Sequence, residues 1–134
     1  MKEAVARAVE EIKAAFPNND AFPKDRVVVK EDDQGGAWVI VEDADVGELY
    51  EAPKSWIGFR ITFQYPNADV YPHFVRSDLL RKDKRALGEA TQGGQNFMGR
   101  PAIQLSRKSN RLNPATDTAL LKLVKVLHWL STHP

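Results

Sequence analysis

The sequence predicts an α+β domain: an N-terminal helix, an antiparallel meander of about four strands, and a long C-terminal helix packed on the sheet. Apolar residues recur at helical spacing near both ends of the chain, and they alternate with polar residues between positions 56 and 64. The 134 residues are enough to bury a hydrophobic core, so we expect one domain over residues 1–134.

The first predicted helix covers residues 2–16 and ends at Pro17, because proline cannot continue a helix. Polar residues lie largely off its apolar face, which should pack against the rest of the domain. Four residues at helical spacing form that face: Val5, Val9, Ile12 and Phe16.

Two short β-branched runs, residues 26–30 and 37–41, predict a β-hairpin. Residues 31–36 between them are acidic and glycine-rich, which is typical of a turn. The acidic residues 42–55 predict an irregular connection. Residues 56–64 then give the clearest strand, since every second side chain is apolar.

A proline-bracketed crossing follows, in which Tyr65 and Pro66 stand at one end and Tyr71 and Pro72 at the other. The next four residues, 73–76, predict a short fourth strand. The polar, glycine-broken stretch after that strand gives no clear secondary structure.

The long C-terminal helix is predicted to begin at Asn113 and Pro114, since asparagine is a favoured N-cap and proline a favoured first helical residue. Residues 101–106 before it predict a short extended segment, and residues 107–111 form a basic link. The predicted apolar stripe of the helix consists of Ala119, Leu120, Leu123, Val124, Leu127 and Leu130.

The chain contains no cysteine, which excludes disulfides, thiolate metal sites and a cysteine nucleophile. The histidines and acidic residues show no metal-ligand spacing, and no cofactor motif is present, so we expect neither a metal nor a cofactor. No apolar run reaches the roughly 18 residues of a membrane span, and the N-terminus does not resemble a signal peptide. We therefore expect a cytoplasmic protein with no membrane partner.

The net charge of +1 hides an uneven distribution. Residues 76–111 carry nine basic and three acidic side chains, a net charge of +6, whereas residues 1–75 carry eight basic and fourteen acidic ones, a net charge of −6. Such charge runs are usually solvated loops, but they also suit a charged partner. Nucleic-acid binding through residues 76–111 is a weaker alternative, because Phe97 is the main aromatic residue there.

Gln104 lies between Ile103 and Leu105, Asn96 precedes it by eight residues, and Pro114 follows it by ten, with Ala115 next. This pattern resembles the active site of ubiquitin-conjugating enzymes. In that family the active-site cysteine lies in an Ile-Cys-Leu setting, a Pro-Asn pair ends eight residues before it, and a Pro-Ala pair follows by ten residues. The chain is thus similar to a catalytically silent, bacterial member of the ubiquitin-conjugating-like superfamily.

The resemblance also covers the order of the elements and the Tyr-Pro crossing. Active relatives continue into two further helices, whereas this sequence stops soon after the long helix. A carboxamide at position 104 cannot carry a thioester, because only a thiolate performs that chemistry. The resemblance therefore implies that the chain has no catalytic residues and is not itself an enzyme.

The implied function is a non-catalytic accessory or binding subunit of a ubiquitin-like conjugation system. Its partner would be a ubiquitin-like protein, an activating enzyme or an active conjugating enzyme. The partner-binding surface would consist of the crossing and the segment around position 104. The implied partner-binding residues are Tyr65, Pro66, Tyr71, Pro72, His73, Asn96, Gln104, Arg107, Lys108 and Arg111.

Other interpretations remain open. Ser106 or Ser109 could serve as a non-cysteine nucleophile, but a serine needs a positioned base, and His73, His128 and His133 lack triad spacing. Asn96 matches a family residue that supports an oxyanion, although without an acyl group a structural role in its loop is favoured. Gln104 itself is either part of a retained docking site or merely tolerated there. A scaffold outside conjugation is a further possibility.

Overall fold

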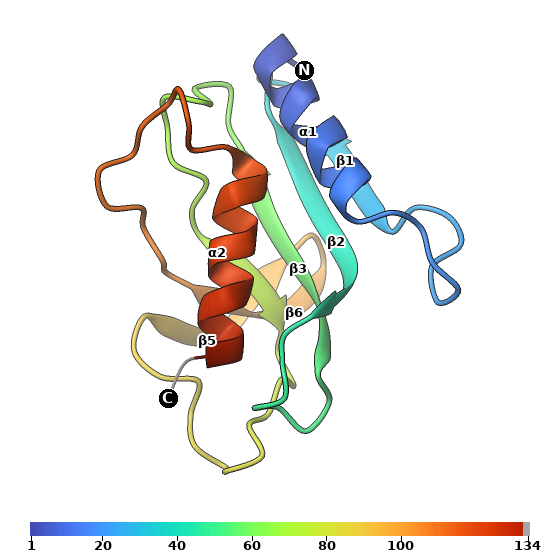
Figure 1. Cartoon of the computed structure of the whole chain (residues 1–134), viewed down its shortest axis with the longest axis vertical. Coiled ribbons are helices and arrows are strands. Elements are labelled where there is room, and N and C mark those ends of the chain that lie inside the picture. Colours follow the sequence, from blue (N-terminus) through green and yellow to red (C-terminus); the bar gives the residue numbers. More distant parts are fainter. Residues whose placement is uncertain (133–134) are drawn as a thin grey trace.

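Two helices cover one face of a six-stranded antiparallel sheet in the computed structural model, which describes residues 1–132 (Figure 1). The strand order is β1-β2-β3-β4-β6-β5. The architecture is α+β, with a helix at each end of the chain, as the sequence predicts. In chain order the elements are α1 (Glu3–Ala15), β1 (Val27–Glu31), β2 (Ala37–Asp45), β3 (Lys54–Ile61), β4 (His73–Arg76), β5 (Thr91–Phe97), β6 (Arg100–Leu105) and α2 (Ala119–Thr132).

The main core lies between the helices and the covered face of the sheet. Strand β3 supplies its alternate residues Ile57, Phe59 and Ile61, all fully buried, as the period of two predicts. The buried residues of α1 include Val5, Val9 and Ile12 of the predicted apolar face, whereas Phe16 only packs against the edge of the core. Burial of these side chains is the main source of stability.

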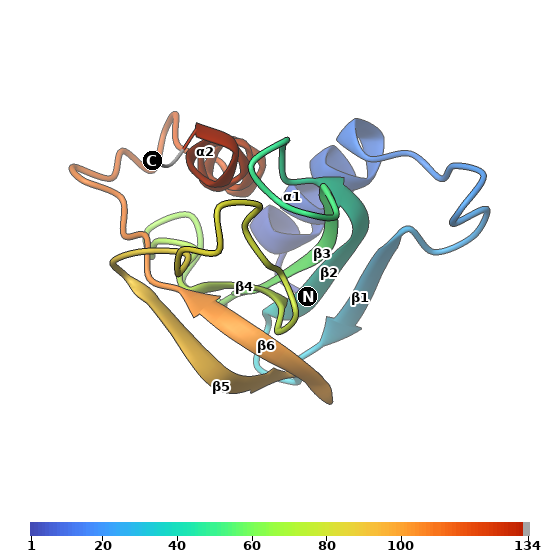
Figure 2. The same ribbon diagram turned by 90° about the horizontal axis from the view of Figure 1, so that it is seen from below.

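A second, smaller core lies on the opposite face of the sheet. The β5–β6 hairpin curls beneath the central strands (Figure 2) and places Phe97 over Gly58 of β3. The Phe97 ring lies 4.8 Å from the ring of Phe74, 5.8 Å from Trp38 and 6.2 Å from Trp56, measured between centroids. Aromatic contacts thus hold the hairpin against the sheet.

The sheet has six strands rather than about four. The two additional strands are β6, which covers most of the predicted extended segment 101–106, and β5, an edge strand formed by residues that sequence analysis left unassigned. Gly93 and Gly94 disfavour a strand by propensity, and a register shift between Gln92 and Gln95 accommodates them. Pairing with β6 therefore outweighs the weak local preference.

Helix α2 begins at Ala119, so the predicted start at Asn113 and Pro114 is wrong. The Asn113 side chain does accept a hydrogen bond from the Ala115 amide, at 3.0 Å, but this bond closes only a turn. The true cap is Thr118, whose hydroxyl accepts the Leu121 amide at 3.1 Å. Two capping residues thus compete within six positions, and the second one starts the helix.

The buried face of α2 also differs from the predicted stripe. Ala119, Leu123 and Leu130 are buried as predicted, but Val124 is 48 % exposed. Lys122 and Val126 take part in the buried face instead.

The contact between Phe97 and Gly58 gives a stability test. A Cβ atom added at Gly58 would lie 2.4 Å from Phe97 Cε2, so Gly58→Ala should lower the free energy of unfolding by about 1–3 kcal/mol. Gly93→Ala is the matched control, because nothing lies within 4 Å of its added Cβ. Urea unfolding of both variants checks this; an equal effect of both would contradict the packing.

Candidate functional site

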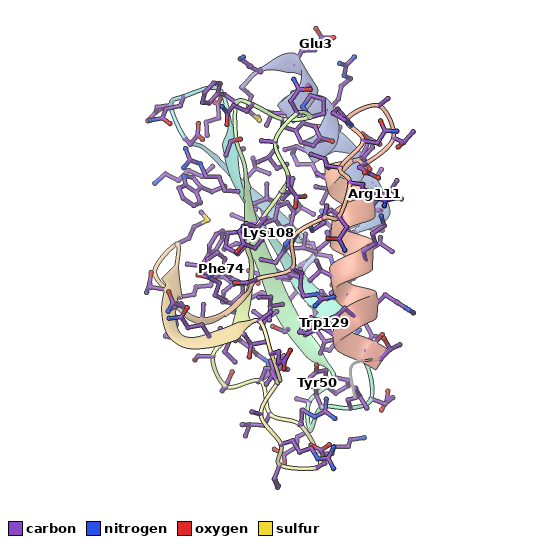
Figure 3. The ribbon with its side chains drawn as sticks, turned by 90° about the vertical axis from the view of Figure 1, so that its left-hand side faces the viewer. Glu3, Tyr50, Phe74, Lys108, Arg111 and Trp129 are labelled. Atoms are coloured by element: carbon purple, nitrogen blue, oxygen red, sulfur yellow. The ribbon has the colours of Figure 1, made fainter. Side chains whose placement is uncertain are left out.

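Gln104 lies within strand β6, where its backbone pairs with Phe74 of β4 on one side and Gln92 of β5 on the other. Its side chain shares a face with Ala102 of the second core, so it points away from the helices. Phe74 lies on that same face (Figure 3). The Gln104 amide Nε2 donates to the Ser106 hydroxyl at 3.1 Å. The position is thus a neutral, hydrogen-bonded strand residue.

Asn96 lies at the tip of the β5–β6 hairpin, opposite Pro101. Its side-chain oxygen accepts the Gly99 amide at 3.0 Å and closes the turn. Pro101 is three residues from Gln104 along β6, which corresponds to about 10 Å of strand. The hairpin therefore does not bring Asn96 and Gln104 together, and the Asn96 contact is a structural one.

The crossing, residues 62–72, holds the start of α2 and the basic link. Tyr65 and Tyr71 each precede a cis proline, Pro66 and Pro72. The Ala119 amide donates to the Tyr65 hydroxyl at 3.0 Å, and the Lys108 ammonium lies 5.2 Å from the centroid of the Tyr71 ring. The two segments predicted to bind a partner are therefore in contact with each other.

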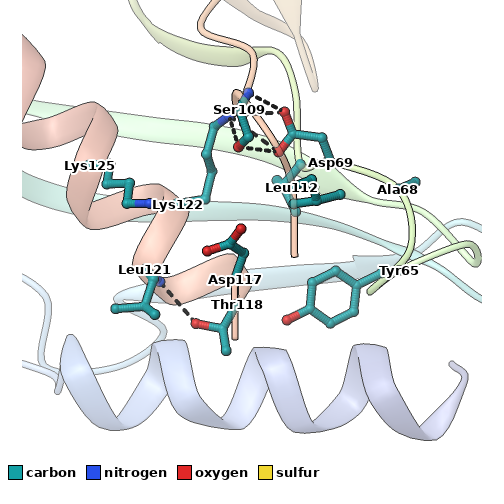
Figure 4. Close-up of a pocket in the computed structure, with 11 residues that line it drawn as sticks. Tyr65, Ala68, Asp69, Ser109, Leu112, Asp117, Thr118, Leu121, Lys122 and Lys125 are labelled. Carbon is teal, nitrogen blue, oxygen red and sulfur yellow. Dashed lines mark hydrogen bonds and ion pairs between the residues drawn. The ribbon is translucent and has the colours of Figure 1, made fainter. Parts of the chain in front are cut away.

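A partly buried polar cluster joins the same segments to α2 (Figure 4). The Lys122 ammonium donates to Asp69 Oδ2 at 3.0 Å and to the Ser109 hydroxyl at 2.8 Å. The Ser109 hydroxyl and amide in turn donate to the two Asp69 oxygens at 2.9 and 2.7 Å. Each of the three side chains comes from a different segment, so the cluster links the crossing, the basic link and helix α2 to one another.

The electrostatics of this cluster favour an ion pair. Burial alone would raise the pKa of Asp69, but hydrogen bonds from Ser109 and Lys122 outweigh burial and hold that pKa below its ordinary value. The Ser109 hydroxyl thus faces an ammonium and a weakly basic carboxylate, neither of which suits proton abstraction from a nucleophile. The adjoining space of about 10 Å³ fits a single water molecule.

Sequence reasoning singled out Ser109 but missed Asp69 and Lys122. A signal was present for Lys122, which stands at helical spacing among Ala119, Leu123 and Val126 and so lies on the apolar face. A lysine at such a position needs a buried acceptor. Nothing in the sequence identified Asp69, 53 residues away, as that acceptor.

His73 is fully buried on the covered face of the sheet, so it cannot contact a partner as predicted. Neither ring nitrogen has a hydrogen-bond partner within residues 1–132, and the ring packs 5.1 Å from that of Phe59. Burial lowers the pKa of His73 to about 3, with a further contribution from the positive charge of Lys122. The imidazole is therefore neutral at physiological pH.

In its described part, the structure positions no histidine base beside either serine. The imidazoles of His73 and His128 make no hydrogen bond to Ser106 or Ser109 within residues 1–132, and His133 lies outside the described residues. No group of three or more potential metal ligands occurs in that same range. None of its helices is both long and apolar enough to cross a bilayer.

Ion pairs neutralise most of the basic segment 76–111. The cations that lie within 4.0 Å of a carboxylate are Arg76, Arg81, Lys82, Lys84, Arg85 and Arg100. The other three, Arg107, Lys108 and Arg111, are exposed and have no such carboxylate among residues 1–132. The excess positive charge is therefore concentrated in the link before α2.

A sequence model of prokaryotic E2 family E matches residues 22–133, which is most of the chain. The chain belongs to this family. No curated protein and no solved structure gives a significant match. Family membership confirms the resemblance to ubiquitin-conjugating proteins and the assignment to a bacterial type. The absence of cysteine from this E2-family chain fits a catalytically silent variant.

The buried histidine predicts a specific pH dependence. Below pH 6.5 the unfolded chain binds a proton at His73, whereas the folded chain does not until about pH 3. Acid therefore favours the unfolded state, and stability should fall by up to about 1.4 kcal/mol per pH unit in this window. His73→Leu should remove that part of the slope. Urea unfolding between pH 4.5 and 7.5 measures it.

The exposed His128 provides the control for that experiment. His128→Gln removes an exposed imidazole and leaves the buried His73 in place, so the slope contributed by His73 should remain. An unchanged slope in His73→Leu would show that His73 titrates normally and would contradict its burial.

The Lys122–Asp69 pair predicts a second stability effect. Lys122→Met leaves a partly buried carboxylate without its cation, which should cost about 3 kcal/mol of unfolding free energy. The double variant with Asp69→Asn should recover part of this loss. Lys82→Met, which removes the exposed partner of Glu48, should cost less than about 1 kcal/mol in the same urea assay. Equal losses for both lysine variants would exclude the buried pair.

Proposed function

We propose that this E2-family domain is a non-catalytic accessory or binding subunit of a ubiquitin-like protein conjugation system. The observation that carries the proposal is the state of position 104. By the resemblance, Gln104 takes the position of the nucleophile of ubiquitin-conjugating enzymes, and it lies in a strand that is paired on both sides, with its amide bonded to Ser106. A carboxamide cannot hold a thioester, and the chain contains no cysteine that could.

Three further observations support binding rather than catalysis. Ser109 is bonded to an ammonium and a carboxylate, neither of which suits it as a nucleophile. The half-buried Tyr71 and the exposed Lys108 come from two segments that contact each other. Lys122 joins these segments to α2 through its bonds to Asp69 and Ser109. A preformed surface binds a partner at a lower entropic cost.

The predicted binding residues do not form one patch. Tyr65, Tyr71 and the basic link adjoin α2, whereas Gln104 lies on the opposite face of the sheet and Asn96 at the hairpin tip. We assign partner binding to the crossing and the basic link. The face around Gln104 would form a separate contact, and His73 takes no part because it is buried.

The partner is a ubiquitin-like protein, an activating enzyme or an active conjugating enzyme of the same system. Isothermal titration calorimetry of the purified chain with each such protein encoded beside it should give a saturable complex with at least one. Absence of binding to all of them would overturn the proposal.

The same proteins test for hidden catalysis. After incubation with the activating enzyme, ATP and the ubiquitin-like protein, the intact mass of this chain should remain unchanged. A hydroxylamine-sensitive adduct that disappears in Ser106→Ala or Ser109→Ala would instead establish an ester-forming enzyme.

A further inference from the structure

A groove runs between residues 107–110 and helix α2. It is a hollow of about 280 Å³ whose floor includes Val126 and Trp129. Figure 3 shows the segment that carries Lys108 and Arg111 beside α2, with Trp129 on the same helix. The groove is separate from Gln104, whose side chain lies on the opposite face of the sheet.

The walls of the groove are strongly cationic. Arg107 and Lys108 come from the link and Lys125 from α2, and none of them has a carboxylate within 4.0 Å among residues 1–132. Lys122 also reaches the groove, but Asp69 already compensates its charge. Asp117 is the one carboxylate lining the groove in the described chain, and it accepts the Asn113 amide at 2.7 Å.

This concentration of charge is local. Among the cations of residues 76–100, three pair with carboxylates from the acidic first half of the chain: Lys82 with Glu48, Lys84 with Glu51 and Arg100 with Glu42. The other three, Arg76, Arg81 and Arg85, pair with Asp78 or Asp83 of their own segment. The acidic half supplies no partner for the groove, apart from Asp69 at its edge. The groove therefore keeps a field that attracts anions, and its concave shape strengthens that field.

We infer that this groove binds an acidic segment of a partner protein, in extended form, through carboxylates that pair with Arg107, Lys108 and Lys125. The inference rests on the proposed binding function and names the chemistry of the partner. The carboxylates of the peptide would replace the missing counter-charges of these three side chains. Charge-assisted hydrogen bonds to arginine and lysine provide the selectivity.

The groove suits a peptide better than a nucleic acid. Single-strand binding needs aromatic faces on which bases stack. The Arg107 guanidinium already lies 4.7 Å from the centroid of the Trp129 ring, and the Lys108 ammonium lies over Tyr71, so both rings are covered by cations. The whole chain has a net charge of only +1, which gives little attraction for a long phosphate backbone.

The test uses a fluorescein-labelled peptide of alternating glutamate and glycine, with the glutamine version as its neutral counterpart. Fluorescence anisotropy with the full chain should show binding of the acidic peptide alone, weakened by added salt. Arg107→Glu with Lys108→Glu, and separately Lys125→Glu, should each weaken it by about tenfold or more. Lys125→Glu disturbs no contact that the structure shows for residues 1–132, so folding is preserved.

Lys82→Glu with Lys84→Glu is the matched control, since it makes the same change in net charge at cations that are already paired. Its affinity for the acidic peptide should stay within about twofold of the unmodified chain. Equal losses in both double variants would reduce the effect to net charge and overturn the inference. Absence of peptide binding would do the same.

Two other occupants are distinguished in the same series. Tighter binding of single-stranded DNA through the same residues would assign the groove to nucleic acid. Concentration-dependent dimers, lost in Lys125→Glu, would assign it to the acidic surface of a second copy. Either result would overturn the inference.

The same measurements distinguish failure of the inference from failure of the proposed function. If conjugation partners bind but Lys125→Glu leaves their affinity unchanged, the groove is not their docking site and only the inference fails. If the acidic peptide binds through the groove while no conjugation protein does, the inference stands and the proposed function fails.

Discussion

The ammonium group of Lys122 is the point at which three separate segments of this domain meet. It projects from the buried face of α2 and bonds to Asp69 of the crossing and Ser109 of the basic link. A buried cation is tolerated only when its charge and its hydrogen bonds are satisfied, so the three segments must approach one another in one arrangement. The position of the basic groove follows from this requirement, since the link forms one of its walls.

The secondary structure that could be predicted was the part set by local periodicity. The spacing of their own apolar residues predicts helix α1 and strand β3: Val5 and Val9 lie four residues apart, and Ile57 and Phe59 lie two apart. Strand β5 could not be predicted in this way, because its glycines and polar residues become a strand only through pairing with β6. The predicted start of α2 was wrong for a related reason. Asn113 and Thr118 are both suitable caps, but the Tyr65 hydroxyl, from another segment, accepts a hydrogen bond from the Ala119 amide at the later start.

The site was predictable to a different extent. The resemblance to ubiquitin-conjugating enzymes selected Gln104 and Asn96, and the concentration of positive charge selected the basic link. Their spatial relation was not predictable, since it depends on the side of the sheet that each strand residue faces and on the register of the hairpin. Burial of His73 and pairing of Lys122 with Asp69 are likewise tertiary properties that arise from residues far apart in the chain.

The two cores of the domain lie on opposite faces of one layer of backbone. The helices anchor one of them, and the other depends on Phe97 resting on Gly58, with Trp38, Trp56 and Phe74 around it. The hairpin that carries position 104 is consequently fastened by its own aromatic anchor and does not rely on any reactive group. Because the Phe97 contact does not involve Gln104, a different side chain at position 104 would leave the packing of the hairpin on the sheet in place.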